Sequence, residues 1–201
     1  MTRRFGLTFD YLCPFARNAN EFAIAALRHG ADFDVTWMPY SLAQGHVDED
    51  EPPIWEREQP DRASGILALQ VGLAARDHLP DRFLDVHEQL FAARHDHGED
   101  LKDPEVVRAA LRRAGVEPDD VFSHVEDGSA LSTLRDEHEA ARSREVWGVP
   151  TFVTDERAVF VRVLDRPNGN TAAAQQRIDA VLELVDGELE LHEFKQVDLP
   201  V

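Results

Sequence analysis

The only cysteine of the chain, Cys13, is the side chain with the clearest potential for chemistry. It directly precedes Pro14, where a strand-like segment gives way to a helical pattern. A helix N-terminus carries unpaired N–H groups and the positive end of the helix dipole, and both stabilise a thiolate. Cysteines at such positions have pKa values lowered to roughly 3.5–7.5, so we expect an accessible, nucleophilic thiol. The alternative is a buried cysteine that behaves as a small apolar side chain.

Histidine and carboxylate side chains gather between positions 87 and 100. Imidazole and carboxylate groups are common metal ligands, but their spacing here matches no recognised metal-binding signature. We therefore predict a solvated helix end and loop, and no metal site. The residues concerned are His87, His95, Asp96, His97, Glu99 and Asp100.

Two further side chains, one near Cys13 and one near the Gly-Val-Pro step at residues 148–150, have more than one interpretation. Arg17 follows Cys13 by one helical turn and is either a surface residue or a contact to an anionic substrate. Trp147 precedes a Gly-Val-Pro step and is predicted to lie in the core rather than to form a platform for a cofactor.

The composition limits the classes of function. The 201 residues, 43% of them hydrophobic, can bury one sizeable core. The net charge of −18 would repel nucleic acid and anionic lipid, so neither is expected as a partner. A single cysteine excludes an internal disulfide and favours a reducing compartment. Without an apolar run of ~20 residues or a signal-peptide pattern, the chain is expected to be cytoplasmic.

The elements that must position Cys13 are a strand, a helix and a second strand. Residues 5–11 are rich in aromatic and β-favouring types and predict a buried strand. Apolar residues at helical spacing predict a helix over residues 14–29, with Gly30 supplying its left-handed end. Residues 32–40 alternate in polarity and predict a half-buried strand.

The remainder of the chain predicts a helical block followed by a hairpin and a last helix. Residues 44–60 are polar and proline-rich, as in an exposed loop. Helices are expected over residues 63–78, 81–94, 104–114, 118–126 and 130–146. Strands are expected over residues 151–154 and 158–163, and a helix over residues 171–185.

This order, β-α-β, a helical block, then β-β-α, predicts an α/β thioredoxin-like fold with a large all-helical insertion. Residues 1–45 and 148–187 would form the thioredoxin-like core, and residues 60–147 the helical insertion. Residues 188–201 would be an acidic C-terminal tail.

Two segments carry a resemblance to a known family. Residues 9–16, Phe-Asp-Tyr-Leu-Cys-Pro-Phe-Ala, resemble the active-site segment of DsbA-like oxidoreductases, and residues 148–153, Gly-Val-Pro-Thr-Phe-Val, resemble its partner segment. The resemblance implies a cis Val149–Pro150 bond that faces the cysteine. Residues 90–93, 98–101, 103–106 and 114–116 also resemble the branch that includes FrnE-type proteins and hydroxychromene-carboxylate isomerases.

The sequence departs from that family at two places. The redox members have Cys-X-X-Cys, whereas this chain has Ala16 at the fourth position, so a mixed disulfide on Cys13 must be released by a thiol from solution. After the hairpin, residues 162–169 replace the glycine-containing segment of the family, so ligand contacts there are expected to differ.

The resemblance implies a monothiol thiol–disulfide oxidoreductase in which Cys13 is catalytic. The substrate-binding residues implied are Pro14, Phe15, Ala16, Arg17, Val149, Pro150 and Thr151. No tightly bound cofactor is expected, and a low-molecular-weight thiol or disulfide is the expected co-substrate. The alternatives are an isomerase or transferase that depends on a glutathione-type thiol, and a non-catalytic binding module. The sequence leaves open whether two copies form a homodimer.

Overall fold

A computed structural model describes residues 2–48, 50–57 and 65–187. The strands are β1 (Arg3–Phe9), β2 (Phe33–Pro39), β3 (Thr151–Val153) and β4 (Ala158–Phe160). The helices are α1 (Pro14–Arg28), α2 (Leu42–Gly45), a short 3-10 helix η1 (Ile54–Glu56), α3 (Ile66–His78), α4 (Pro80–His95), α5 (Pro104–Arg113), α6 (Pro118–Glu126), α7 (Ser129–Ser143) and α8 (Thr171–Gly187). The predicted acidic tail lies outside the described residues.

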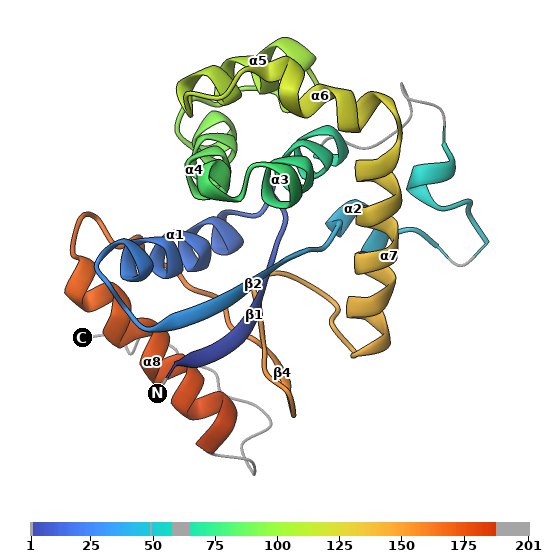
Figure 1. The fold of residues 1–201 in the computed structure, drawn as a ribbon. Helices are drawn as coiled ribbons and strands as arrows, with labels where there is room; N and C mark the ends of the chain where they lie inside the picture. The colour runs from blue at the N-terminus through green and yellow to red at the C-terminus, as the bar shows by residue number, and fades with distance from the viewer. Residues whose placement is uncertain (1, 49, 58–64, 188–201) are drawn as a thin grey trace, which may run out of the picture.

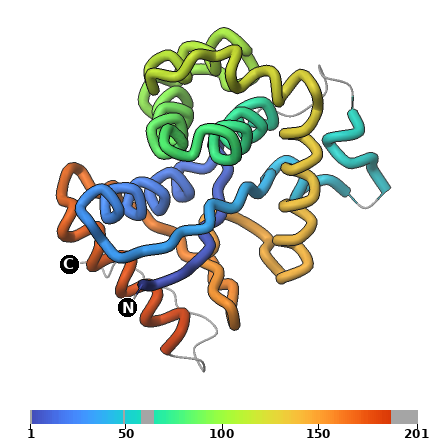
Figure 2. Tube along the Cα trace, viewed as in Figure 1, coloured from blue at the N-terminus to red at the C-terminus, as the bar shows by residue number. Residues whose placement is uncertain are grey.

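The strands form one mixed sheet in the order β2-β1-β3-β4. The crossover through α1 makes β1 and β2 parallel, with Phe5 opposite Val35. Strand β3 runs antiparallel to β1, with Leu7 opposite Phe152, and β4 completes the hairpin. The sheet therefore joins segments that lie before and after the helical block in the sequence, coloured blue and orange in Figure 2. The predicted thioredoxin-like α/β fold is confirmed.

Helices cover the sheet in two groups (Figure 1). Helix α8 packs along α1, and Arg3 of β1 forms an ion pair with Asp179 of α8 at 2.9 Å. The helices from α3 to α7 follow one another between β2 and β3, with α4 against α1 and α7 against β2. No helix within the described ranges is long and apolar enough to cross a bilayer.

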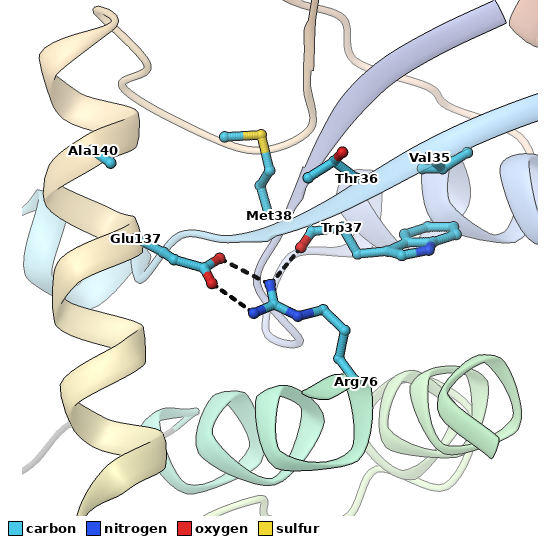
Figure 3. A pocket seen from close by; sticks show the side chains of 7 residues that line it. All are labelled: Val35, Thr36, Trp37, Met38, Arg76, Glu137 and Ala140. Atoms are coloured by element: carbon cyan, nitrogen blue, oxygen red, sulfur yellow. Dashed lines mark hydrogen bonds and ion pairs between the residues drawn. The ribbon is translucent and has the colours of Figure 1, made fainter. Parts of the chain in front are cut away.

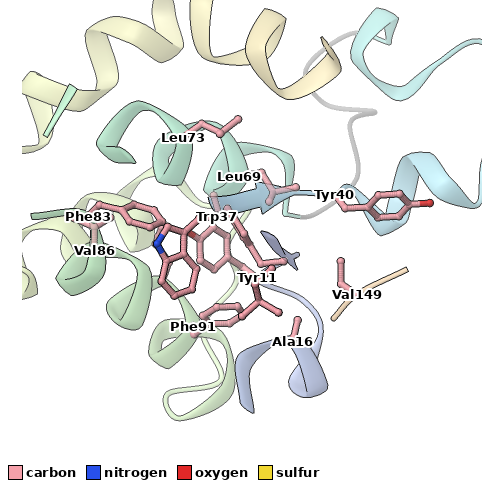
Figure 4. Close-up of a cluster of buried hydrophobic side chains, with 14 of the residues drawn as sticks. Tyr11, Ala16, Trp37, Tyr40, Leu69, Leu73, Phe83, Val86, Phe91 and Val149 are labelled. Atoms are coloured by element: carbon pink, nitrogen blue, oxygen red, sulfur yellow. The ribbon is translucent and has the colours of Figure 1, made fainter. Parts of the chain in front are cut away.

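An aromatic cluster joins the sheet to the helical block (Figure 4). Tyr11 packs edge-on against Phe91 of α4, and Trp37 of β2 packs against Phe83. These side chains are buried, and each stabilises the fold by about 1.5–3 kcal/mol. The cluster thereby fixes α4 against the chain that enters α1.

The structure differs from the sequence prediction mainly between positions 41 and 57. Just before the loop expected over residues 44–60, Ser41 caps the short helix α2 by accepting a hydrogen bond from the Gln44 N–H. The Gln44 side chain then accepts one from the Ile54 N–H at 2.7 Å, and Ile54 and Trp55 are buried. These side-chain hydrogen bonds give no periodic signal in the sequence. Strand β4 ends at Phe160 rather than at position 163.

Candidate active site at the Cys13 thiol

Cys13 is the N-cap residue of α1. A turn after β1 places it there, since its N–H donates to the Asp10 carbonyl at 3.0 Å. Its backbone is extended, and Pro14 occupies the first turn, where a missing N–H removes no hydrogen bond. The Ala16 N–H donates to the Cys13 Sγ at 3.4 Å. The sulfur therefore takes the place that a serine or aspartate oxygen takes in an ordinary N-cap.

The Val149 carbonyl faces the same sulfur from the other side of the site. The Cys13 thiol donates to the Val149 oxygen at 3.5 Å, across 136 positions of sequence. The Val149–Pro150 peptide bond is cis, and both residues are buried. The two segments that carry the family resemblance thus meet at the thiol.

Hydrogen bonds to β1 hold this second segment in place. The Thr8 hydroxyl donates to the Gly148 carbonyl at 3.3 Å and accepts from the Thr151 N–H at 2.7 Å. The Thr151 hydroxyl also donates to the Gly148 carbonyl, at 2.8 Å. Thr151 therefore fixes the loop beside the thiol, and its own hydroxyl is already engaged.

Cys13 is buried, with 8% of its surface exposed. Burial raises its pKa, outweighing the N–H groups of Ala16 and Phe15, which lower it. The charge of Asp10 raises the pKa further and that of Arg162 lowers it. The expectation of an accessible thiol with a lowered pKa is wrong for this structure, because Cys13 is buried and desolvation outweighs the helix N-terminus.

Asp10 is a site residue that the sequence analysis did not assign. It is buried and accepts hydrogen bonds from the N–H groups of Leu12 and Leu42, both at 2.9 Å. Burial raises its pKa to about 6 in spite of these bonds. Its position, at the end of a strand and three residues before the cysteine, was the only available signal.

We expect the alkylation rate of Cys13 by a neutral thiol reagent to keep rising with pH above 8, because the folded thiol resists ionisation. Asp10→Asn removes a neighbouring negative charge, so it should shift this curve to lower pH and speed the reaction severalfold at pH 7. Asp34→Asn, an exposed change on β2, is the matched control and should leave the curve unchanged. A wild-type rate that is already maximal below pH 7 would contradict this expectation.

Arg17 is buried in a group of ion pairs. Its side chain is 8% exposed and forms ion pairs with Glu21 at 2.9 Å and with Asp96 at 2.6 Å. Arg166 pairs with the same two carboxylates, at 2.7 and 3.2 Å. This group of four residues, the Arg17–Asp96 cluster, balances two positive charges with two negative ones. Arg17 is therefore not a surface residue, and its role as a substrate contact stays a prediction.

The other predicted binding residues differ in exposure. Pro14 is exposed, Phe15 is half-buried, and Ala16 is fully buried beneath the thiol. Trp147 is 69% exposed and packs in a tilted arrangement on Phe160 with 4.7 Å between ring centroids, so its predicted place in the core is wrong.

The histidines and carboxylates between positions 87 and 100 have separate roles. His87 is buried, with Nδ1 2.8 Å from the Tyr11 hydroxyl and Nε2 3.0 Å from the Asn20 side-chain oxygen. His95 contacts the Tyr11 carbonyl at 3.0 Å, whereas Asp96 belongs to the Arg17–Asp96 cluster. Within the described part of the chain, no three such side chains gather as a metal site would require.

A cavity of about 390 Å³ lies elsewhere, at the edge strand β2 (Figure 3). Arg76 closes one side of it by donating to both oxygens of Glu137, at 2.8 and 2.5 Å, and to the Trp37 carbonyl. The lining contains none of the residues around the thiol, so this cavity is separate from the candidate site.

The chain is similar in sequence to a mycobacterial protein and in fold to several solved structures. An uncharacterized protein of Mycobacterium tuberculosis is 27% identical over 169 residues, which cover 82% of this chain and 70% of that protein. The probable DsbA oxidoreductase from Streptomyces coelicolor is 16% identical with a TM-score of 0.60, over 97% of this chain and 94% of that one.

Two further solved structures share the fold. The periplasmic thioredoxin-like protein from Salmonella enterica serovar Typhimurium is 19% identical with a TM-score of 0.59, over 90% of this chain and 88% of that one. The cytosolic disulfide reductase DsbM from Pseudomonas aeruginosa, solved with GSH, is 16% identical with a TM-score of 0.57, over 90% and 100%. Residues 7–166 match the DSBA-like thioredoxin domain, and the chain belongs to that family.

Proposed function

We propose that the protein exchanges small thiols through Cys13 alone. The Cys13 thiol loses its proton to solvent, and the sulfur attacks one sulfur of a small disulfide. A Cys13–S–S–R bond forms while the other half leaves as a thiolate and takes up a proton. A second small thiol then attacks the outer sulfur, which leaves as a new disulfide and returns Cys13 to the thiol. One turn replaces one thiol partner in the disulfide with another.

The observation that carries this proposal is the position of the sulfur between the Ala16 N–H and the Val149 carbonyl. The N–H remains as a donor to the thiolate, while the carbonyl loses its donor when the proton leaves. Family membership supports the same chemistry. The name of the Pseudomonas aeruginosa neighbour, a cytosolic disulfide reductase solved with GSH, supports a small thiol as co-substrate in a reducing cytoplasm.

The raised pKa of Cys13 favours attack by its ionised sulfur on a disulfide over its departure from a mixed disulfide. A thiol of high pKa is a strong nucleophile once ionised and a poor leaving group. The mixed disulfide on Cys13 should therefore persist until a second thiol attacks its outer sulfur. The monothiol chemistry thus differs from that of a strong oxidant, whose cysteine has a lowered pKa.

The test is catalysis of exchange between a small disulfide and an excess of a different small thiol. Wild-type protein should raise the rate above the uncatalysed exchange, with ping-pong kinetics. Cys13→Ser should abolish the increase while it preserves α1, because serine is also a good N-cap. Equal rates for the two proteins would contradict the proposal.

A non-catalytic binding module is the second candidate, and the burial and raised pKa of Cys13 favour it. In that case the thiol would serve only as the N-cap of α1 and as a donor to Val149. The exchange assay separates the two candidates, because a binding module would leave the exchange rate at its uncatalysed value. Membership of the branch with FrnE-type proteins and hydroxychromene-carboxylate isomerases stays a prediction.

A further inference from the structure

Among the residues that the structure describes, the charged side chains around Cys13 are held in ion pairs or, for Asp10, by backbone N–H groups, and Arg162 is the exception. The four residues of the Arg17–Asp96 cluster neutralise one another. Arg162 is exposed and forms no ion pair with a residue that the structure describes. Its guanidinium lies 5.0 Å from the centre of the Phe15 ring, two residues after the cysteine. A positive charge that no carboxylate within the described ranges neutralises therefore stands at the rim of the thiol site.

The backbone on both sides of Arg162 is fixed to the site. The Val161 N–H donates to the Pro150 carbonyl at 3.1 Å, which extends the pairing beyond β4. The carbonyls of Val163 and Leu164 accept from the Asn18 side chain at 3.0 and 2.9 Å. Arg162 is thus held between the cis-proline loop and α1, the two elements that meet at the sulfur.

The contact with Phe15 leaves the guanidinium suited to bind an anion. An arginine over an aromatic face is held by cation–π attraction, and its planar N–H groups still point outward along the edge. These donors match the spacing of a carboxylate, which they bind in a bidentate manner. The neighbouring Phe15 ring cannot neutralise the charge as a carboxylate would.

We propose that Arg162 binds a carboxylate of the small thiol or disulfide that reacts at Cys13. The inference rests on the proposed function and adds the substrate class to it. A chain of net charge −18 repels anions, so an anionic substrate needs a local positive charge near the reacting atom. Arg162 also lies in the segment 162–169, for which the sequence predicts ligand contacts that differ from those of the family.

The test compares three disulfides that differ in charge: dithiodipropionate, with two carboxylates; neutral hydroxyethyl disulfide; and cystamine, with two ammonium groups. Intact mass gives the rate of adduct formation on Cys13 for each. The ratio of the dithiodipropionate rate to the hydroxyethyl disulfide rate is the readout, because any change in the ionisation of Cys13 cancels. Arg162→Gln should lower this ratio about fivefold, the upper range for an exposed ion pair.

Two matched variants complete the design. Arg4→Gln removes an equal charge from an exposed position at the start of β1 and should leave the ratio unchanged. Arg162→Lys keeps the positive charge and should retain part of the preference. Added salt should reduce the wild-type ratio.

Three outcomes would overturn the inference in distinguishable ways. An unchanged ratio in Arg162→Gln would remove the anion-binding role and leave thiol exchange intact. An equal loss of rate for all three disulfides would show that Arg162 acts on the thiol rather than on the substrate. Failure of wild-type Cys13 to react with any of them would overturn the proposed function, and this inference with it.

Discussion

Ala16→Cys should release a mixed disulfide from Cys13 without any thiol from solution. Position 16 lies within one turn of Cys13, and its N–H already contacts the Cys13 sulfur at 3.4 Å. A thiol there would attack the Cys13 sulfur, expel the small thiol and leave an internal disulfide. Intramolecular attack should shorten the lifetime of the adduct by at least ~100-fold, measured by intact mass after excess reagent is removed.

Ala19→Cys is the matched control for this variant. Ala19 is equally buried in α1, so both changes add one sulfur atom to a packed interior. Position 19 is too far along the helix to reach Cys13, and its adduct should last as long as the wild-type adduct. An adduct that persists equally in Ala16→Cys and Ala19→Cys would show that positions 13 and 16 lack the geometry for disulfide closure.

His87→Gln should remove a large part of the acid sensitivity of the fold. His87 bridges the Tyr11 hydroxyl and the Asn20 side chain, and Asn20 in turn donates to the Ala16 carbonyl at 2.7 Å. Burial lowers the pKa of His87 from 6.5 to about 3. The unfolded chain therefore binds a proton at a pH where the folded protein does not.

The difference between the folded and unfolded pKa of His87 sets the direction in which pH changes the stability of the fold. The stabilising contribution of neutral His87 is complete above pH 6.5 and is lost as the pH falls toward 3, by about 5 kcal/mol in total. Glutamine retains one donor and one acceptor but does not titrate. The gap in unfolding free energy between wild type and His87→Gln should therefore shrink steadily below pH 6.5, as measured by denaturant unfolding.

Asp10 acts in the opposite direction, because its raised pKa of about 6 makes the folded state bind the extra proton between pH 4 and 6. Both proteins share Asp10, so its contribution cancels in the difference between them. His29→Gln, an exposed change at the end of α1, should follow the wild-type pH profile. A constant gap between wild type and His87→Gln across pH 4–7 would contradict the assignment of His87.

The sequence predicted the elements whose signals are local. Residue types that favour strands predicted β1, helical periodicity predicted α1 and alternation predicted β2, and the Cys13–Pro14 step marked the N-cap of α1 correctly. A short β3–β4 hairpin and the order of the helices also followed from turn and cap residues. These features depend on neighbours within a few positions, which a single sequence contains.

The environment of the side chains depended on distant residues and was not predictable in this way. Arg17 looked like a possible surface residue, but Asp96 and Arg166, 79 and 149 positions away, enclose it with Glu21. Cys13 looked reactive by its helix position, but the Val149 carbonyl and the core bury it. Periodicity in one segment does not show which distant segment of the chain will cover its side chains.

The proposed function requires that Cys13 alone carries a small thiol between two partners. The most direct measurement is the intact mass of wild-type protein quenched with acid during exchange between a small disulfide and a small thiol. We expect one covalent adduct per chain, located on Cys13, which forms after the disulfide is added and disappears when the free thiol is in excess. Unmodified protein throughout accelerated exchange would contradict it.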